Sequence, residues 1–248
     1  MDRIIYTAMS GAKQSLERQS AVANNMANVS TSGFRAELSA ARAVPINGAG
    51  YATRAITADS TPGSDFTPGS FSTTGRALDV AINGEGWLAV QAGNGDTAYT
   101  RNGGLQVDPT GMLMSQGRPV LGEDGPIILP LNAEVSIAGD GTISAREAGT
   151  QVQAEVGRLM LASNPDGRMA RREDGLFGAW NAQGGPMAAL PRDEDVQVIS
   201  GTLEGSNVNP TEAMVAMIDT ARRFEMNMKV LTTADENDQR ANSLLSMN

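Results

Sequence analysis

The residue types that carry out most nucleophilic catalysis are scarce in this sequence. It contains neither histidine nor cysteine, which excludes the common nucleophile–base triads, thiol nucleophiles and zinc–thiolate sites. Lysine occurs only at Lys13 and Lys229, and both lie on the expected exposed faces of helices. Serine–lysine chemistry therefore has little basis here.

Paired carboxylates are the remaining candidates for acid–base chemistry. Glu123/Asp124 and Asp193/Asp195 could in principle serve a glycoside hydrolase, which needs two acids. Both pairs lie in loop-like segments, where solvated surface acids are much commoner than catalytic ones. We therefore expect no catalytic residues.

Two short glycine-containing motifs fall short of ligand-binding signatures. Asp140-Gly141-Thr142 lacks the repeated acidic ligands of a calcium loop. Gly84-Glu85-Gly86 is followed by Trp87, where a phosphate-binding P-loop needs lysine. We expect no metal site and no cofactor.

Composition narrows the candidate partners. The formal charge of −9 makes nucleic acid and anionic membranes poor partners, because like charges repel. No segment approaches the roughly 20 apolar residues of a membrane-spanning helix. The opening Met1–Gln14 does not resemble a signal peptide, since polar residues interrupt its short apolar stretch. If the protein leaves the cytoplasm, we expect export without a cleaved signal.

The first 28 residues have a heptad pattern that predicts a helix. Steps of four and three residues connect its mostly apolar or small members. These positions are Ile5, Met9, Ala12, Leu16, Gln19, Ala23 and Met26. Turn-forming residues at 29–33 predict that the helix ends near Asn28.

The last forty residues repeat this design. Asn209-Pro210-Thr211-Glu212 predicts a helix start, with Asn209 as the cap and Pro210 in the first turn. The expected seam again follows steps of three and four residues. It consists of Met214, Met217, Ala221, Phe224, Met228 and Leu231.

Between these ends the pattern changes to short strands. From about Gly75, apolar residues alternate with period two, and turn residues separate the runs. Asn83-Gly84, Asn102-Gly103-Gly104, Asp108–Gly111 and Gly139-Asp140-Gly141 are hairpin signals. They predict an antiparallel β-domain, sandwich-like or partly closed.

Together these regions predict an α+β fold in which long N- and C-terminal heptad helices pair and flank an inserted antiparallel β-domain. Narrow seams of comparable length suit a helix partner better than a flat sheet. The expected regions are 1–34 (assembly helix), 35–75 (connector with some β structure), 76–204 (β-domain) and 205–248 (assembly helix). The alternative is that both helices pack on their own β-domain.

Three motifs carry a resemblance to the flagellar rod and hook proteins. Ala23–Arg35 closely resembles the family's N-terminal signature, and Leu203–Glu212 resembles its C-terminal one. Thr74–Trp87, continued by Tyr99–Gly103, looks like the central motif of the rod and hook members. All three occur in the family's order and cover both ends and the middle of the chain.

The resemblance implies a structural subunit of the proximal rod that polymerises through its paired terminal helices. Its expected partners are other rod proteins, including the distal rod protein, further copies of itself and the flagellar type III export apparatus. Its expected location is the periplasmic rod of the basal body. We expect the assembly interface to comprise the apolar seam residues given above together with Asn24, Asn25, Asn28 and Phe34, although the asparagines could equally terminate the helix.

Two alternatives remain open. The chain could be the distal rod protein of the same family. It could also be a secreted β-rich module that binds, for instance, glycans. The second alternative explains the turn-rich middle but leaves the heptad helices at both ends unexplained.

Overall fold

The computed structural model describes residues 2–45, 55–59, 63–147, 152–164, 168–181, 183–187 and 189–246. The chain forms two compact units. The helical unit contains residues 1–29, 36–65 and 208–248, and the β unit contains residues 30–35 and 66–207. The segment expected to be a connector, 35–75, is thus divided between the two units.

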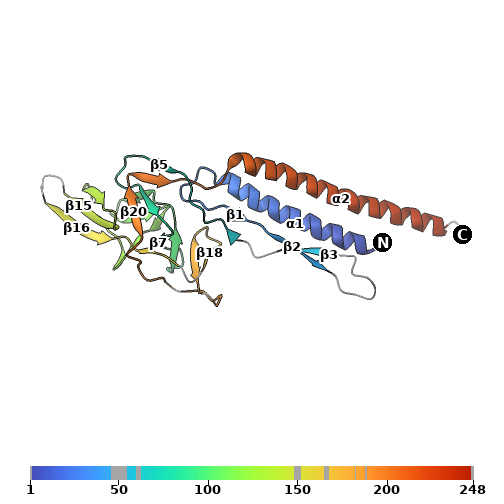
Figure 1. Ribbon diagram of the computed structural model, residues 1–248, viewed down its shortest axis with the longest axis horizontal. Coiled ribbons are helices and arrows are strands. Elements are labelled where there is room, and N and C mark those ends of the chain that lie inside the picture. The colour runs from blue at the N-terminus through green and yellow to red at the C-terminus, as the bar shows by residue number, and fades with distance from the viewer. Residues whose placement is uncertain are drawn as a thin grey trace. The chain divides into compact units, whose positions relative to one another are not determined.

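The two terminal helices pair, as the sequence predicted. Helix α1 (Asp2–Ala27) and helix α2 (Pro210–Ser246) run antiparallel and side by side in the helical unit (Figure 1). The side chain of Asn209 accepts hydrogen bonds from the backbone N–H groups of Thr211 and Glu212, at 3.0 and 3.4 Å, which confirms the predicted cap.

Small residues form the contact between the two helices. A Cβ atom added at Gly11 would lie 3.0 Å from the side-chain oxygen of Asn227, so the helices approach closely at this point. Ala8 and Ser15, one turn before and after Gly11, are buried. Thr220 and Ala234, seven residues on either side of Asn227, are also buried. Small side chains therefore surround the point of closest approach.

Four short strands complete the helical unit. Strands β2 (Ala41–Pro45) and β3 (Ala55–Asp59) pair antiparallel, and β3 packs on α1. The Ser10 hydroxyl accepts a hydrogen bond from the N–H of Thr57 at 3.4 Å. Strand β1 (Glu37–Leu38) pairs with β4 (Gly63–Ser64).

All strand pairs in the β unit are antiparallel among the residues that the structure describes. The largest sheet has the order β17-β7-β8-β19-β18, and its strands are Leu161–Ala162, Trp87–Gln91, Thr97–Thr100, Phe177–Trp180 and Arg168–Arg171. Two three-stranded sheets have the orders β11-β10-β9 (Arg118–Pro119, Leu113–Ser115, Leu105–Val107) and β14-β15-β16 (Glu134–Ile137, Thr142–Arg146, Gln153–Arg158). Three strand pairs are β12-β13 (Leu121–Gly122, Gly125–Pro126), β20-β6 (Gln197–Ser200, Val80–Asn83) and β21-β5 (Thr202–Glu204, Phe71–Thr73).

The core of the β unit is mainly aliphatic, as the low aromatic content suggests. Leu88, Leu105, Leu113 and Leu161 are fully buried in one large cluster. Trp87, Tyr99 and Phe177 belong to a second, smaller cluster. The Tyr99 hydroxyl accepts a hydrogen bond from the N–H of Leu190, and burial raises the pKa of this phenol.

Two of the predicted hairpins are confirmed and two are wrong. Strands β9 and β10 pair across Asp108–Gly111, and β14 and β15 pair across Gly139–Gly141. At Asn83-Gly84, by contrast, β6 pairs with β20 while β7 pairs with β8 and β17. Strands β8 and β9, on either side of Asn102–Gly104, likewise pair with other strands. The loop at Asn83-Gly84 instead binds a buried arginine, as described below.

Gly103 allows a backbone contact that any side chain would block. A Cβ atom at this position would lie 1.7 Å from the carbonyl oxygen of Val80, whose N–H donates to the carbonyl oxygen of Gly103 at 2.9 Å. Gly157, in β16, has open space around the same point and no unusual backbone conformation. Substitution of Gly157 therefore serves as a control for substitution of Gly103.

We predict that Gly103→Ala lowers the free energy of unfolding of the β unit by about 3 kcal/mol or more, because the backbone must shift. Gly157→Ala should change it by less than about 1 kcal/mol. Tryptophan fluorescence measures this selectively, since Trp87 and Trp180 are the only tryptophans and both lie in the β unit. Equal effects of the two substitutions would contradict the role assigned to Gly103.

Candidate functional site

A single buried carboxylate lies where distant parts of the chain meet inside the β unit. Glu204 is only 1% exposed. One of its oxygens is 2.8 Å from a terminal nitrogen of Arg35, and the other is 2.8 Å from one of Arg101. The Arg101 Nε also donates to Glu204 at 2.9 Å, and the N–H of Gly69 donates at 3.0 Å. We call Arg35, Arg101 and Glu204 the Glu204 node.

The loop around Asn83-Gly84 binds the guanidinium of Arg101. The terminal nitrogens of Arg101 donate to the carbonyl oxygens of Gly84 at 2.7 Å, Gly86 at 2.6 Å and Ile82 at 3.1 Å. These carbonyl groups point at the cation instead of joining β6 to β7 in a two-stranded hairpin. The expected hairpin is absent here because the loop serves as a ligand of Arg101.

The segment 30–35 is held in the β unit by several independent contacts. Arg35 donates to the carbonyl oxygen of Thr67 at 2.7 Å, and Arg171 donates to the carbonyl oxygen of Arg35. Phe34 is buried, and its ring faces the Arg171 guanidinium at 4.6 Å. The segment that follows α1 in the chain is thus anchored through both its side chains and its backbone.

Gly33 brings this segment against the node. Its N–H donates to the backbone oxygen of Glu204 at 2.8 Å. It has a φ of +68°, and a Cβ there would lie 2.3 Å from the carbonyl carbon of Arg101. Only glycine meets both conditions without strain or a clash. Gly33 therefore belongs to the node as much as the charged residues do.

The node is costly to break and hard to replace with a different geometry. Removing one partner of a buried ion pair typically costs about 3–5 kcal/mol, because the other charge stays buried and unpaired. Here one carboxylate serves two cations, and backbone carbonyls accept further hydrogen bonds from both guanidinium groups. The node therefore specifies how residues 33–35, 82–86, 101 and 204 come together.

The asparagine cluster near the end of α1 is bonded within the helical unit. The Asn25 side chain donates to the carbonyl oxygen of Glu37 at 2.9 Å and accepts from its N–H at 2.7 Å. Asn24 donates to the Glu37 carboxylate at 2.9 Å, and Asn28 donates to the backbone oxygen of Asn24 at 2.9 Å. Asn25 thus attaches β1 to the helix, and Asn28 satisfies a carbonyl group at the helix end.

The predicted interface residues of the helices fall into two groups. Some are buried or half-buried, namely Ile5, Ala12, Met26, Met217, Ala221, Phe224 and Leu231. Others are exposed, namely Met9, Leu16, Ala23, Met214 and Met228. Sequence reasoning placed the last group on the same seams as the first.

The positions that the sequence reasoning missed are small residues next to larger apolar ones. Ala8 and Ser15 are buried where Met9 and Leu16 were chosen, and Ala213 is buried where Met214 was chosen. Glycine at position 11, together with Ala8 and Ser15 at turn spacing, was an available signal for close helix packing. The hydroxyls of Ser15 and Thr220 donate within their own helices to Gly11 and Ala216, so their burial requires no partner across the seam.

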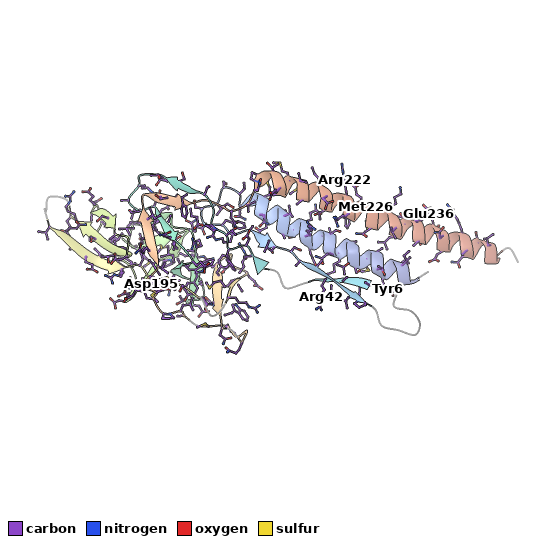
Figure 2. All side chains as sticks on the ribbon, viewed as in Figure 1. Tyr6, Arg42, Asp195, Arg222, Met226 and Glu236 are labelled. Atoms are coloured by element: carbon purple, nitrogen blue, oxygen red, sulfur yellow. The ribbon has the colours of Figure 1, made fainter. Side chains whose placement is uncertain are left out.

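Several large apolar side chains on the two helices are exposed. On α1 they are Ile4, Tyr6, Met9 and Leu16, and on α2 they are Met214, Val215, Ile218, Met226, Met228, Val230 and Leu244. Met9 is 61% exposed and Leu16 is 51% exposed. Figure 2 labels two of these residues, Tyr6 on α1 and Met226 on α2. We call these residues the outer face.

The described residues include no cluster of three acidic side chains placed to hold a metal ion. Within the same residues, neither helix is long and apolar enough to cross a membrane.

Comparison with known proteins identifies the family. Residues 5–35 match the model described as flagella basal body rod protein, and residues 81–145 match the flagellar hook protein FlgE/F/G D1 domain. Residues 199–244 match the flagellar basal body rod FlgEFG protein C-terminal model. Arg35 and Glu204 lie in the first and third of these matches, and Arg101 lies in the second.

Relatives that match over the full length of the chain support the same family. The chain is 53% identical to the flagellar basal-body rod protein FlgF of Salmonella typhimurium and 52% identical to that of Escherichia coli, and each comparison covers 100% of both chains. It is 32% identical to the rod protein FlgG of Agrobacterium fabrum over 94% of each chain. The chain belongs to the flagellar basal-body rod protein family. It is more similar to these two FlgF proteins than to this FlgG protein.

We predict that Asn25→Ala releases β1 from α1, because the Glu37 backbone loses both of its partners on the helix. Hydrogen exchange at the amide of Glu37 should accelerate by about tenfold or more, as expected for loss of a hydrogen bond worth about 1.5 kcal/mol. Asn24→Ala removes only a bond to the exposed carboxylate and should leave that amide protected. Unchanged exchange in the Asn25 variant would show that β1 is held by other contacts.

Proposed function

We propose that this protein is a structural subunit of the bacterial flagellar rod, close to FlgF in role, and not an enzyme. The observation that carries the proposal is the division of side chains on the helical hairpin. Small residues close the hairpin on itself, whereas large apolar residues remain on the outer face. A monomer gains nothing from keeping so many large apolar groups in water.

The outer face suits packing against other subunits. Its exposed side chains include four methionines, which are flexible and adapt to neighbours of different shape. Such adaptability fits a short rod in which the neighbours are non-identical proteins. Further copies of this chain and other rod proteins, including the distal rod protein, are the proposed partners.

The distribution of charge along the chain also favours assembly through the terminal helices. Residues 1–34 hold three basic and two acidic side chains, and residues 209–248 hold four basic and six acidic ones. The assembling ends are therefore nearly neutral, and most of the net charge of −9 belongs to the remaining residues. Weak net charge reduces repulsion between helices of neighbouring subunits.

The proposal also specifies where the subunit is located and how it is exported. A rod subunit belongs to the periplasmic part of the basal body, and the flagellar type III apparatus is the proposed export machinery. The 53% identity to a FlgF protein over the full length, against about 32% to a FlgG protein, favours a proximal over a distal rod role. A secreted glycan-binding module would not require the outer face.

We predict that Leu16→Asp blocks incorporation into the rod and abolishes swimming, because it places a charge in an apolar contact between subunits. The tryptophan-monitored unfolding of the β unit should not change. Leu16→Met keeps the site apolar and should preserve swimming. The measurements are soft-agar motility and the content of purified basal bodies, in cells that lack the native protein.

Export must be measured in the same cells, since a variant that is not exported cannot assemble. The decisive comparison is the exported pool of each variant against its amount in basal bodies. Exported Leu16→Asp protein at native levels in the rod would contradict the proposal.

A further inference from the structure

The Glu204 node joins residues that are far apart in the sequence. Arg35 is followed by Arg101 after 66 residues and by Glu204 after 103 more, as the residue numbers show. Both arginines are buried, with relative exposures of 2% and 3%. The carboxylate that neutralises them comes from β21, near the end of the β unit in chain order.

Each arginine needs this carboxylate before it can be buried at low cost. Backbone carbonyls of residues 67, 82, 84 and 86 accept hydrogen bonds from the two guanidinium groups, but they carry no full negative charge. The Glu204 carboxylate lies within ion-pair distance of both Arg35 and Arg101. A β unit without Glu204 in place would bury these two cations without the carboxylate that they share.

Backbone contacts at the node depend on the same residue. The carbonyl oxygen of Glu204 accepts from Gly33, and its carboxylate accepts from Gly69. Residues 202–204 also pair with residues 71–73 as β21 and β5. Arrival of one short segment therefore fixes residues 33–35, residues 69–73 and the loop at 82–86 together.

We propose that Glu204 is the closing residue of the β unit: neutralisation of Arg35 and Arg101 by the Glu204 carboxylate is part of the rate-limiting step of folding. The node then forms in the transition state for folding and is not added afterwards. A chain that becomes available from its N-terminus keeps the β unit unfolded until residue 204 follows. Under the proposed function, on which this step rests, the subunit is exported as an unfolded chain. The need for Glu204 then delays folding until most of the chain has passed through the export apparatus.

The test is the folding kinetics of the purified full-length protein, followed by fluorescence of Trp87 and Trp180. Glu204→Gln keeps the size of the side chain and removes its charge. We expect its refolding rate to fall by at least about tenfold while its unfolding rate changes by less than about twofold. Its thermal midpoint should fall by about 10 °C or more. Refolding after a brief unfolding pulse keeps proline isomers native and removes their slow phases.

Glu134→Gln is the matched control. Glu134 pairs with Arg146 in a cross-strand ion pair whose side chains are largely exposed, so its loss should leave both rates nearly unchanged. If Glu204→Gln does not fold, Arg35→Lys supplies the same test, because it keeps the charge but loses the planar fork of arginine. This variant should also slow refolding more than it speeds unfolding.

A faster unfolding rate with an unchanged refolding rate, in either variant, would overturn the proposal. That result would show a node that forms after the transition state and only stabilises the finished fold. The measurement uses the monomer alone and leaves the rod proposal untouched. Failure of Leu16→Asp to block assembly would, conversely, leave the closing role of Glu204 intact.

Discussion

The ion pairs of Glu204 with Arg35 and Arg101 organise the β unit. Burying these charges is unfavourable unless each finds its partner, so the network tolerates one arrangement of the surrounding backbone. It orders the loop at 82–86, fixes Gly33 in a left-handed conformation and places Phe34 in the interior. The three segments by which the sequence resembles its family meet at this point.

The helical unit follows a different physical rule. Its seam relies on close approach of two backbones, with Gly11 opposite Asn227 and small buried residues on both sides. Close approach leaves no room for large side chains, which must then occupy other faces of the helices. The intrachain seam and the outer face are thus two consequences of the same packing. One closes the hairpin, and we propose that the other holds the subunit in the rod.

Much of this fold could be predicted from the sequence. The heptad patterns, the Asn209 cap and the turn residues after Asn28 define both helices and their pairing, because these signals are local. Hairpins at Asp108–Gly111 and Gly139–Gly141 were equally readable. The helix faces were harder to assign, since Met9 and Leu16 looked like better seam residues than Ala8 and Ser15. Hydrophobicity alone favours the larger residue, whereas backbone contact selects the smaller.

The node was not predictable from local patterns. Arg35, Arg101 and Glu204 lie in three segments that no periodicity connects, and a charged residue near glycines usually indicates a solvated turn. A hairpin was wrongly predicted at Asn83-Gly84, because the partner of this loop lies outside the local pattern. That partner is the side chain of Arg101, 17 residues further along the chain. Long-range charge pairing becomes visible only when the backbone is in place.

We propose that the outer face contacts neighbouring subunits while the small-residue seam contacts only the chain's own helices. A photo-crosslinking amino acid at Leu16 or Ile218, compared with one at Ala12, tests this directly in purified basal bodies. The account predicts that Leu16 and Ile218 yield crosslinks between separate chains, whereas Ala12 yields crosslinks within one chain. Crosslinks between chains from Ala12, with none from Leu16 or Ile218, would contradict it.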